Sequence, residues 1–191
     1  ASQGAVSEYF AIPYSPFTGS PTKNRTILDE MVKHPLWFTV PLSPEEIEVI
    51  SAQFLTDPRH RVWEVWRGGD LVGMLLLSRI TPNQDALLHF TFFGASLFRM
   101  RALLQNFVAM CFREYGLERL SFEAPEHIGG LVSFMRRKLG FRYEGEAAVA
   151  GHQIAKFLAE PGAGKGRAHT ADPAQWIAKQ GSRREHSYWT G

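Results

Sequence analysis

The chain has 191 residues, of which 45% are hydrophobic and 13% are aromatic, and its formal net charge at pH 7 is +2. This length fits one domain with a tail, and the apolar content is sufficient for a core, which excludes a disordered chain. So small a net charge does not indicate nucleic-acid binding. The single cysteine, Cys111, excludes an intramolecular disulfide framework and a cysteine-rich metal site. No apolar stretch approaches the ~20 residues of a membrane span, so we expect a soluble, cytoplasmic protein.

The N-terminal part of the chain predicts an extended segment followed by two helices. Residues 1–24 are rich in Ser, Thr, Gly and Pro, and we expect an arm whose aromatic side chains lie on an apolar surface. A first helix is expected to begin near Asn24 or Thr26 and to end before Pro35. The second helix has a clearer start, because Ser43 can cap it and is followed by a proline and two glutamates.

The rest of the chain alternates between predicted strands and helices. Residues 60–80 predict a β-hairpin, since β-favouring residues flank the turn sequence RGGD. Further elements are expected as strand 85–94, a long helix from about 98 to a cap at Gly116, strand 117–125, helix 128–139, and strands 141–149 and 152–160. This order predicts an α/β (α+β) fold with a mixed central sheet of about six to seven strands flanked by helices.

One stretch near the end of this predicted domain carries a recognisable motif. Helix 128–139 ends in the sequence KLGF, and the following strand begins RYEG. The stretch from Lys138 to Gly145 resembles a signature of the GNAT superfamily of acyl-CoA N-acyltransferases, in which the corresponding helix ends in Lys-x-Gly-Phe with Glu-Gly just beyond. The hairpin sequence WRGGDLVGMLLL is also similar to the hairpin of that family.

The resemblance divides the chain and implies a cofactor site. It covers about residues 25–160 as a GNAT-like acyltransferase domain, and it leaves 1–24 as an N-terminal arm and 161–191 as a C-terminal linker and tail. It implies that the central parallel strands 85–94 and 118–124 splay apart at their C-terminal ends. Acetyl-CoA would lie in that opening, with its pantetheine arm on a strand edge and its pyrophosphate at the N-terminus of the long helix.

Three positions depart from the family pattern. Arg99 and Arg101 stand where the family's phosphate-binding turn has glycines. The arginines could hold phosphate with their side chains, or their bulk could block the turn, and both interpretations stay open. Arg136 replaces a tyrosine that acts as general acid in the family; it cannot donate a proton at neutral pH but could stabilise negative charge. The cofactor-binding candidates are therefore Phe90, Thr91, Phe92, Arg99, Met100, Arg101, Ala102 and Arg136.

The candidate catalytic residues each have a more ordinary interpretation. His89 could be the base that takes a proton from the attacking ammonium, or a hydrogen-bonded histidine in a sheet. Asp85 could be a catalytic carboxylate, or a common residue after a turn. Glu123 could line the opening or lie solvated at a strand end, and Tyr143 could replace the missing tyrosine or be a strand aromatic. The histidines show no metal-ligand spacing, so no metal is expected.

These observations predict an acyl-CoA-dependent N-acyltransferase, most simply an acetyltransferase, in which an amine attacks the thioester directly. The acceptor could be a small amine, a protein N-terminus or lysine, or a modified nucleobase. The alternative is a catalytically degenerate GNAT-like domain that serves in binding or assembly, as in some tailed-phage virion proteins, and a third is a sensor without turnover. The aromatic arm and tail suggest contacts with further copies of the chain or with an assembly partner.

Overall fold

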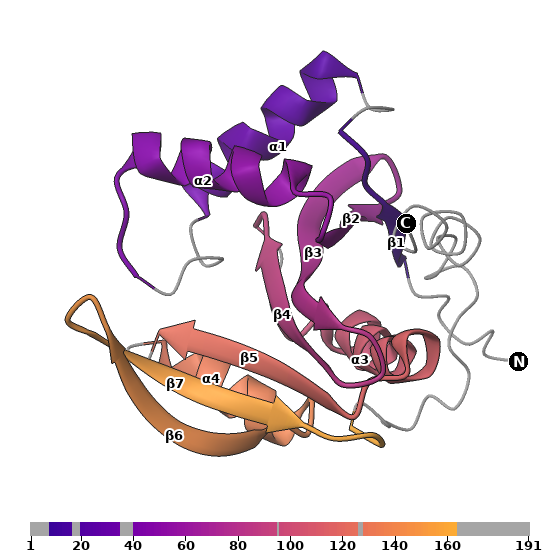
Figure 1. Ribbon diagram of the computed structural model, residues 1–191. Helices are drawn as coiled ribbons and strands as arrows, with labels where there is room; N and C mark the ends of the chain where they lie inside the picture. The colour runs from indigo at the N-terminus through magenta and orange to yellow at the C-terminus, as the bar shows by residue number, and fades with distance from the viewer. Residues whose placement is uncertain (1–7, 17–19, 35–39, 95, 126–127, 164–191) are drawn as a thin grey trace, which may run out of the picture.

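The computed structural model in Figure 1 describes residues 8–16, 20–34, 40–94, 96–125 and 128–163. Within these residues, seven strands form a single sheet in the order β1-β2-β3-β4-β5-β7-β6. The strands are β1 (Tyr9–Pro13), β2 (Arg61–Arg67), β3 (Asp70–Thr81), β4 (Asp85–Phe92), β5 (Arg119–Pro125), β6 (Arg142–Val149) and β7 (His152–Ala159). The helices are α1 (Pro21–Lys33), α2 (Pro44–Thr56), α3 (Arg101–Tyr115) and α4 (Gly129–Arg137). The expected mixed sheet of about six to seven strands is confirmed.

The sheet is antiparallel except at its centre. β1 to β4 form an antiparallel meander, and β5, β7 and β6 form a second antiparallel group. The two groups join where β4 and β5 pair in parallel. A parallel pair needs a crossover connection, and α3 supplies it. The centre of the sheet is therefore the only described place where two strands point the same way.

Each face of the sheet is covered by its own pair of helices. Figure 1 shows α1 and α2 on one side of the sheet and α3 and α4 on the other. Beneath α1 and α2 lies a cluster of buried residues: Tyr14, Ile27, Met31, Leu55, Val62, Met74, Leu76 and Phe93. Alternate strand residues, such as Leu75 and Leu88, point to the larger cluster beneath α3 and α4. None of the described helices has the length and apolar character that a bilayer crossing requires.

The N-terminal elements differ from those expected. α1 begins at Pro21 rather than near Asn24 or Thr26, because Ser20 caps it and accepts a hydrogen bond from the Lys23 N–H at 3.1 Å. Within the segment expected to be an arm, Tyr9–Pro13 forms β1, the edge strand that pairs with β2. Residues 1–7 and 164–191, which include most of the expected tail, lie outside the described residues.

The other helix boundaries follow their local signals closely. At the start of α2, Ser43 Oγ accepts from the Glu46 N–H at 3.2 Å and Glu46 Oε1 accepts from the Ser43 N–H at 3.2 Å. This is the reciprocal capping box that the sequence favours at an N-terminus. α3 ends at Gly116, whose φ of 61° is left-handed, as expected for a glycine cap. α3 begins at Arg101, slightly later than the expected start near residue 98.

β3 and β4 approach closely beside the site described below. Gly73 of β3 is the register partner of Phe92 of β4. A Cβ atom at position 73 would collide with the Phe92 ring and would lie only 2.6 Å from the Thr91 carbonyl oxygen. Gly73 therefore leaves the space in which the Phe92 ring lies.

We expect the substitution Gly73→Ala to lower the free energy of unfolding by about 1–3 kcal/mol, because the added methyl group overpacks a buried position. Urea unfolding of the variant and the wild type would measure this change. Gly69→Ala is the matched control, since a Cβ there would meet nothing within 4 Å. Equal unfolding midpoints for Gly73→Ala and the wild type would show that Phe92 is not held in place by this contact.

Candidate functional site

β4 and β5 are paired over only part of their length. Their Cα partners run from Asp85↔Arg119 to Leu88↔Phe122. Beyond these pairs, residues 89–92 of β4 and 123–125 of β5 continue without pairing to each other. Figure 1 shows the two strands diverging toward their C-terminal ends. We call the space between these two segments the opening; the splayed strands expected from the sequence are therefore present.

Aromatic rings line the opening on the α3/α4 side. The rings of Phe90 and Phe122 stack with their centroids 5.0 Å apart, and those of Phe90 and Phe92 lie 5.5 Å apart. They border a cavity of about 70 Å³, whose other lining residues are Thr91, Leu97, Ile128 and Leu131. Because ligand pockets usually measure roughly 300–1,000 Å³, this cavity does not enclose a cofactor by itself. A bound chain would instead lie along the free strand edges.

The turn from β4 into α3 is closed by its own backbone hydrogen bonds. The N–H groups of Arg99 and Met100 donate to the carbonyl oxygens of Ser96 and Leu97, each at 3.1 Å. The Met100 side chain is fully buried, so this cofactor candidate is a core residue. The first N–H of α3 to bond within the helix is that of Leu104, which donates to the Met100 carbonyl oxygen. The N–H groups of Ala102 and Leu103, just before it, have no backbone acceptor in the described chain.

Cationic side chains lie in this turn and at the end of α4. Arg99 and Arg101 are exposed and form no ion pair with any described residue, and the same is true of Arg136 on α4. The C-terminal end of α4 adjoins the turn, because the Lys138 Nζ lies 6.0 Å from the centre of the Phe98 ring. We call Arg99, Arg101, Arg136 and Lys138 the basic cluster. Its two turn arginines are exposed.

His89 is the first β4 residue beyond the paired segment, and it faces α1 and α2. Its Nε2 lies 2.8 Å from the Ser78 Oγ, and its ring lies edge-on to Phe54 at 5.7 Å. Burial lowers the pKa of His89 to about 3, with smaller contributions from the charges of His60 and Arg79. The imidazole is therefore neutral at pH 7 and a weak base, which favours the interpretation as a hydrogen-bonded sheet histidine.

The structure brings only one other catalytic candidate to the opening. Glu123 lies on the unpaired end of β5, and it faces the α1/α2 side because its neighbours Phe122 and Ala124 point into the opposite core. Its carboxylate is partly buried and has no hydrogen bond or ion pair with described residues. Asp85 lies at the closed end of the strand pair, where it contacts Arg119 at 3.4 Å.

Tyr143 is also remote from the opening. It lies on β6, which β7 separates from β5. Its hydroxyl donates a hydrogen bond to the Glu146 Oε1 at 3.0 Å, and its ring packs edge-on against Phe157. The position fits an ordinary strand aromatic. The structure therefore groups His89, Glu123 and the strand residues 90–92, and it leaves Asp85 and Tyr143 elsewhere.

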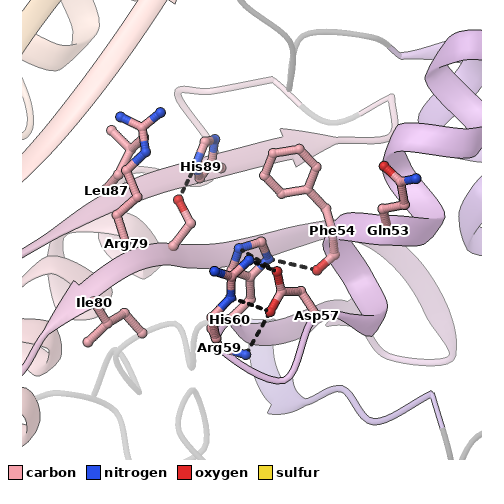
Figure 2. A pocket seen from close by; sticks show the side chains of 10 residues that line it. Gln53, Phe54, Asp57, Arg59, His60, Arg79, Ile80, Leu87 and His89 are labelled. Carbon is pink, nitrogen blue, oxygen red and sulfur yellow. Dashed lines mark hydrogen bonds and ion pairs between the residues drawn. The ribbon is translucent and has the colours of Figure 1, made fainter.

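A larger cavity, which the sequence analysis did not identify, lies on the α1/α2 face. We call it the α2 cavity; its volume is about 550 Å³, and Figure 2 shows the side chains that line it. They come from the end of α2 and the loop after it, from the end of β3, and from β4: Gln53, Phe54, Asp57, Arg59, His60, Ser78, Arg79, Ile80, Leu87 and His89. The sequence DPRH after α2 was the available signal, but it reads as an ordinary turn.

The polar side chains of the loop after α2, in the lower part of Figure 2, hydrogen-bond to one another or to the backbone. Both Asp57 oxygens accept from the Arg59 guanidinium, at 3.1 and 2.8 Å, and these hydrogen bonds help to lower the pKa of Asp57 to about 2. The His60 Nδ1 lies 2.9 Å from the Phe54 carbonyl oxygen, and the His60 ring stacks on Phe54 at 5.2 Å. The charges of Asp57 and Arg59 therefore offset each other at this side of the α2 cavity.

Comparison with known proteins gives matches at the level of structure. No protein-family model and no curated protein sequence matches the chain. Two mutant structures of the spermidine N-acetyltransferase SpeG from Vibrio cholerae are each 14% identical, cover 85% of this chain and 99% of their own, and superpose with TM-scores of 0.62 and 0.63. A dodecameric structure of spermidine N-acetyltransferase from the same organism is 16% identical, covers 81% of this chain and 95% of its own, and has a TM-score of 0.58. The chain therefore has the GNAT fold, as the sequence motif predicted.

The lowered pKa of His89 predicts a pH-dependent stability. Above the ordinary pKa of 6.5 the histidine is neutral in both states, so the folded protein bears no penalty. As the pH falls below 6.5, the unfolded chain binds a proton that the folded chain refuses until about pH 3, so stability is lost. Between about pH 6.5 and pH 5 the loss should approach ~1.4 kcal/mol per pH unit.

The free energy of urea unfolding, measured across this pH range, tests the prediction. His89→Gln should flatten the pH dependence relative to the wild type. His152→Gln, at an exposed position on β7, controls for the removal of one histidine. If His89→Gln and the wild type lose stability in parallel as the pH falls, His89 is not the group responsible.

Proposed function

We propose that the protein is an acyl-CoA-dependent N-acetyltransferase that acts in the cytoplasm. The observation that supports this is the opening, where β4 and β5 stop pairing beside the N-terminus of α3. Unpaired N–H and C=O groups on two facing strand edges can hydrogen-bond an amide-containing chain as an added strand would. The pantetheine arm of acetyl-CoA is such a chain, and the similar structures named above are acetyltransferases.

The residues beside the opening suit the anionic end of acetyl-CoA. The N–H groups of Ala102 and Leu103 stand at the helix N-terminus, where the helix dipole favours an anion. Arg99 and Arg101 are exposed beside them and carry no acidic partner in the described chain. In this proposal the arginine side chains replace the close backbone approach that glycines allow in the family. Lys138 and Arg136 of the basic cluster would meet further phosphate oxygens.

In the proposed reaction the acceptor amine attacks the thioester carbonyl from the α1/α2 side. An N–C bond forms and the C–S bond breaks, so that the coenzyme leaves as a thiolate, which takes a proton from solvent. Strand N–H groups at the opening would stabilise the negative charge on the carbonyl oxygen. Before it attacks, the acceptor ammonium would give one proton to Glu123, a carboxylate beside the opening with no partner among the described residues, rather than to His89. As the amide forms, the nitrogen would lose its second proton to solvent.

The alternatives remain distinguishable from this proposal. None of the similar structures reported above supports a degenerate binding or assembly domain. A sensor would bind acetyl-CoA without acetylating any amine. Of the segments expected to mediate assembly, residues 164–191 of the tail lie outside the described residues, whereas Tyr9–Pro13 of the arm forms the edge strand β1. A homo-oligomer is proposed on the likeness to a spermidine N-acetyltransferase whose structure is dodecameric.

We expect acetyl-CoA to bind and to stabilise the folded protein by about 2.7 kcal/mol at a concentration one hundred times its Kd. Arg101→Glu should abolish this stabilisation, because it places a negative charge beside the pyrophosphate. Arg113→Glu makes the same charge change at the other end of α3 and is the matched control. Isothermal titration and thermal unfolding would measure both effects. Unchanged affinity in Arg101→Glu would remove Arg101 from the phosphate site, and no binding to the wild type would remove the transferase proposal.

Glu123→Gln should lower kcat about a hundredfold or more while leaving the affinity for acetyl-CoA unchanged, because it removes the base but not the strand edge. Release of free thiol from acetyl-CoA, measured with a panel of amines, gives the rate. His89→Gln should lower kcat much less, since His89 is a weak base. A larger loss for His89→Gln than for Glu123→Gln would reverse these two assignments.

A further inference from the structure

The α2 cavity and the opening meet at one residue. His89 lines the cavity and is also the first β4 residue after the last paired position, Leu88. Both His89 and Glu123 face the α1/α2 side, where the cavity lies. A molecule in this cavity can therefore extend past His89 toward the opening. The cavity, at about 550 Å³, falls within the usual range for small-molecule sites, roughly 300–1,000 Å³.

One cation of this cavity has no compensating charge. Asp57 is bonded by Arg59, so these two charges cancel. His89 is neutral at pH 7 because burial lowers its pKa. Arg79 is exposed and has no ion pair with any residue that the structure describes. The uncompensated charge that a ligand meets in the α2 cavity is therefore positive.

A backbone irregularity places Arg79 there. Ser78 pairs with Leu87 and Thr81 pairs with Asp85, so two β3 residues lie opposite one β4 residue, which is a β-bulge. Uninterrupted alternation would send Ser78 to the α1/α2 face and Arg79 to the opposite core, as it sends Leu77. The bulge instead leaves both Ser78 and Arg79 lining the cavity, and Figure 2 shows the Arg79 side chain beside Leu87 and His89.

The bulge requires a strained backbone conformation at Arg79. Arg79 has a φ of 49°, in the left-handed region that glycine adopts readily and that branched or long side chains seldom adopt. Backbone strain at such a φ persists only where the surrounding structure enforces it, and strained residues are most frequent at functional sites. Here the strained residue is also the cation that faces the cavity. The remaining walls include apolar groups, with Phe54, Ile80 and Leu87 among them.

From these observations we infer that the α2 cavity recognises the acceptor, and that the acceptor is an amino acid-like amine carrying a carboxylate and an apolar side chain. The carboxylate pairs with Arg79, the apolar side chain lies against Phe54 and Ile80, and the amine points past His89 toward the opening. This inference rests on the proposed acetyl transfer for the fate of the amine, but the ligand class follows from the cavity alone. A polyamine such as spermidine, the substrate named for the similar structures, would bring positive charge to a positive site.

Direct titration of the 191-residue chain tests the inference without acetyl-CoA. L-phenylalanine and phenethylamine form a matched pair, because they differ only in the carboxylate, and spermidine is the third probe. We expect L-phenylalanine to bind about tenfold or more tightly than phenethylamine, the gain of one charge-assisted contact. In two-dimensional NMR spectra the amide signals of His60, Ser78 and His89 should shift with L-phenylalanine and not with spermidine.

Arg79→Gly should remove the preference for L-phenylalanine without loss of folding stability, because glycine accepts the left-handed φ. Arg79→Asn gives a second uncharged residue that tolerates this conformation. Ala150→Gly, at a residue with the same φ of 49° in the β6–β7 turn, is the matched backbone control and should keep the preference.

Three results would overturn the inference: equal or tighter binding of phenethylamine or spermidine, no binding of L-phenylalanine at about millimolar concentration, or an unchanged preference in Arg79→Gly and Arg79→Asn. Its failure can be told apart from that of the proposed function. If acetyl-CoA binds but polyamines are the preferred ligands, only the acceptor class is wrong. If L-phenylalanine binds through Arg79 but acetyl-CoA does not bind, the cavity assignment stands and the transferase proposal fails.

Discussion

The early end of hydrogen bonding between β4 and β5 is the constraint on which the rest of this structure depends. After Leu88 and Phe122, each strand presents backbone N–H and C=O groups that the other strand no longer satisfies. Such groups are costly to leave without partners, whether protein, water or ligand. On their outer sides the same segments stay paired, β4 with β3 and β5 with β7. The sheet therefore has an internal edge on each side of the opening, to which an added strand could hydrogen-bond.

Packing on the two faces explains why the strands stay apart. On the α3/α4 side, Phe90 and Phe122 stack between the diverging strands, and Gly73 leaves room for the ring of Phe92. On the α1/α2 side, Thr91 donates a hydrogen bond to the His34 carbonyl oxygen at 3.0 Å, which ties the unpaired end of β4 to the end of α1. Closing the opening would require both arrangements to be lost.

Charge is distributed differently on the two faces. The basic cluster combines two arginines of the turn before α3 with two cations at the end of α4, without acidic partners in the described chain, and we propose it for the phosphates of acetyl-CoA. On the other face, Asp57 and Arg59 neutralise each other, and a single strained arginine carries the net charge of the α2 cavity. The two proposed binding regions thus share a positive charge but differ in the number of charges they carry.

The sequence by itself determined the elements and their order, because these depend on local signals. The capping box at Ser43 and the left-handed Gly116 define helix ends within a few residues. The KLGF motif predicted the GNAT fold, although the similar solved structure is only 14% identical to this chain. The sequence also predicted the strand that carries residues 90–92, which lie beside the opening. Where the local signal was weaker, as in the Pro- and Ser-rich segment before α1, the edge strand β1 was not recognised, since a strand of five residues depends on its partner for stability.

Only the tertiary structure decided which charged residues meet. Asp85 and Glu123 are both strand carboxylates, but pairing register puts one at the closed end of the strands and the other at the opening. Burial, which no sequence pattern gives, turns His89 from a plausible base into a neutral hydrogen-bonded residue. The α2 cavity depends on a one-residue bulge that turns the Arg79 side chain to the other face of the sheet. The alternation of apolar and polar residues in the sequence does not predict where such a one-residue shift occurs. Register and burial arise from contacts between segments far apart in the chain, and so they belong to the folded structure alone.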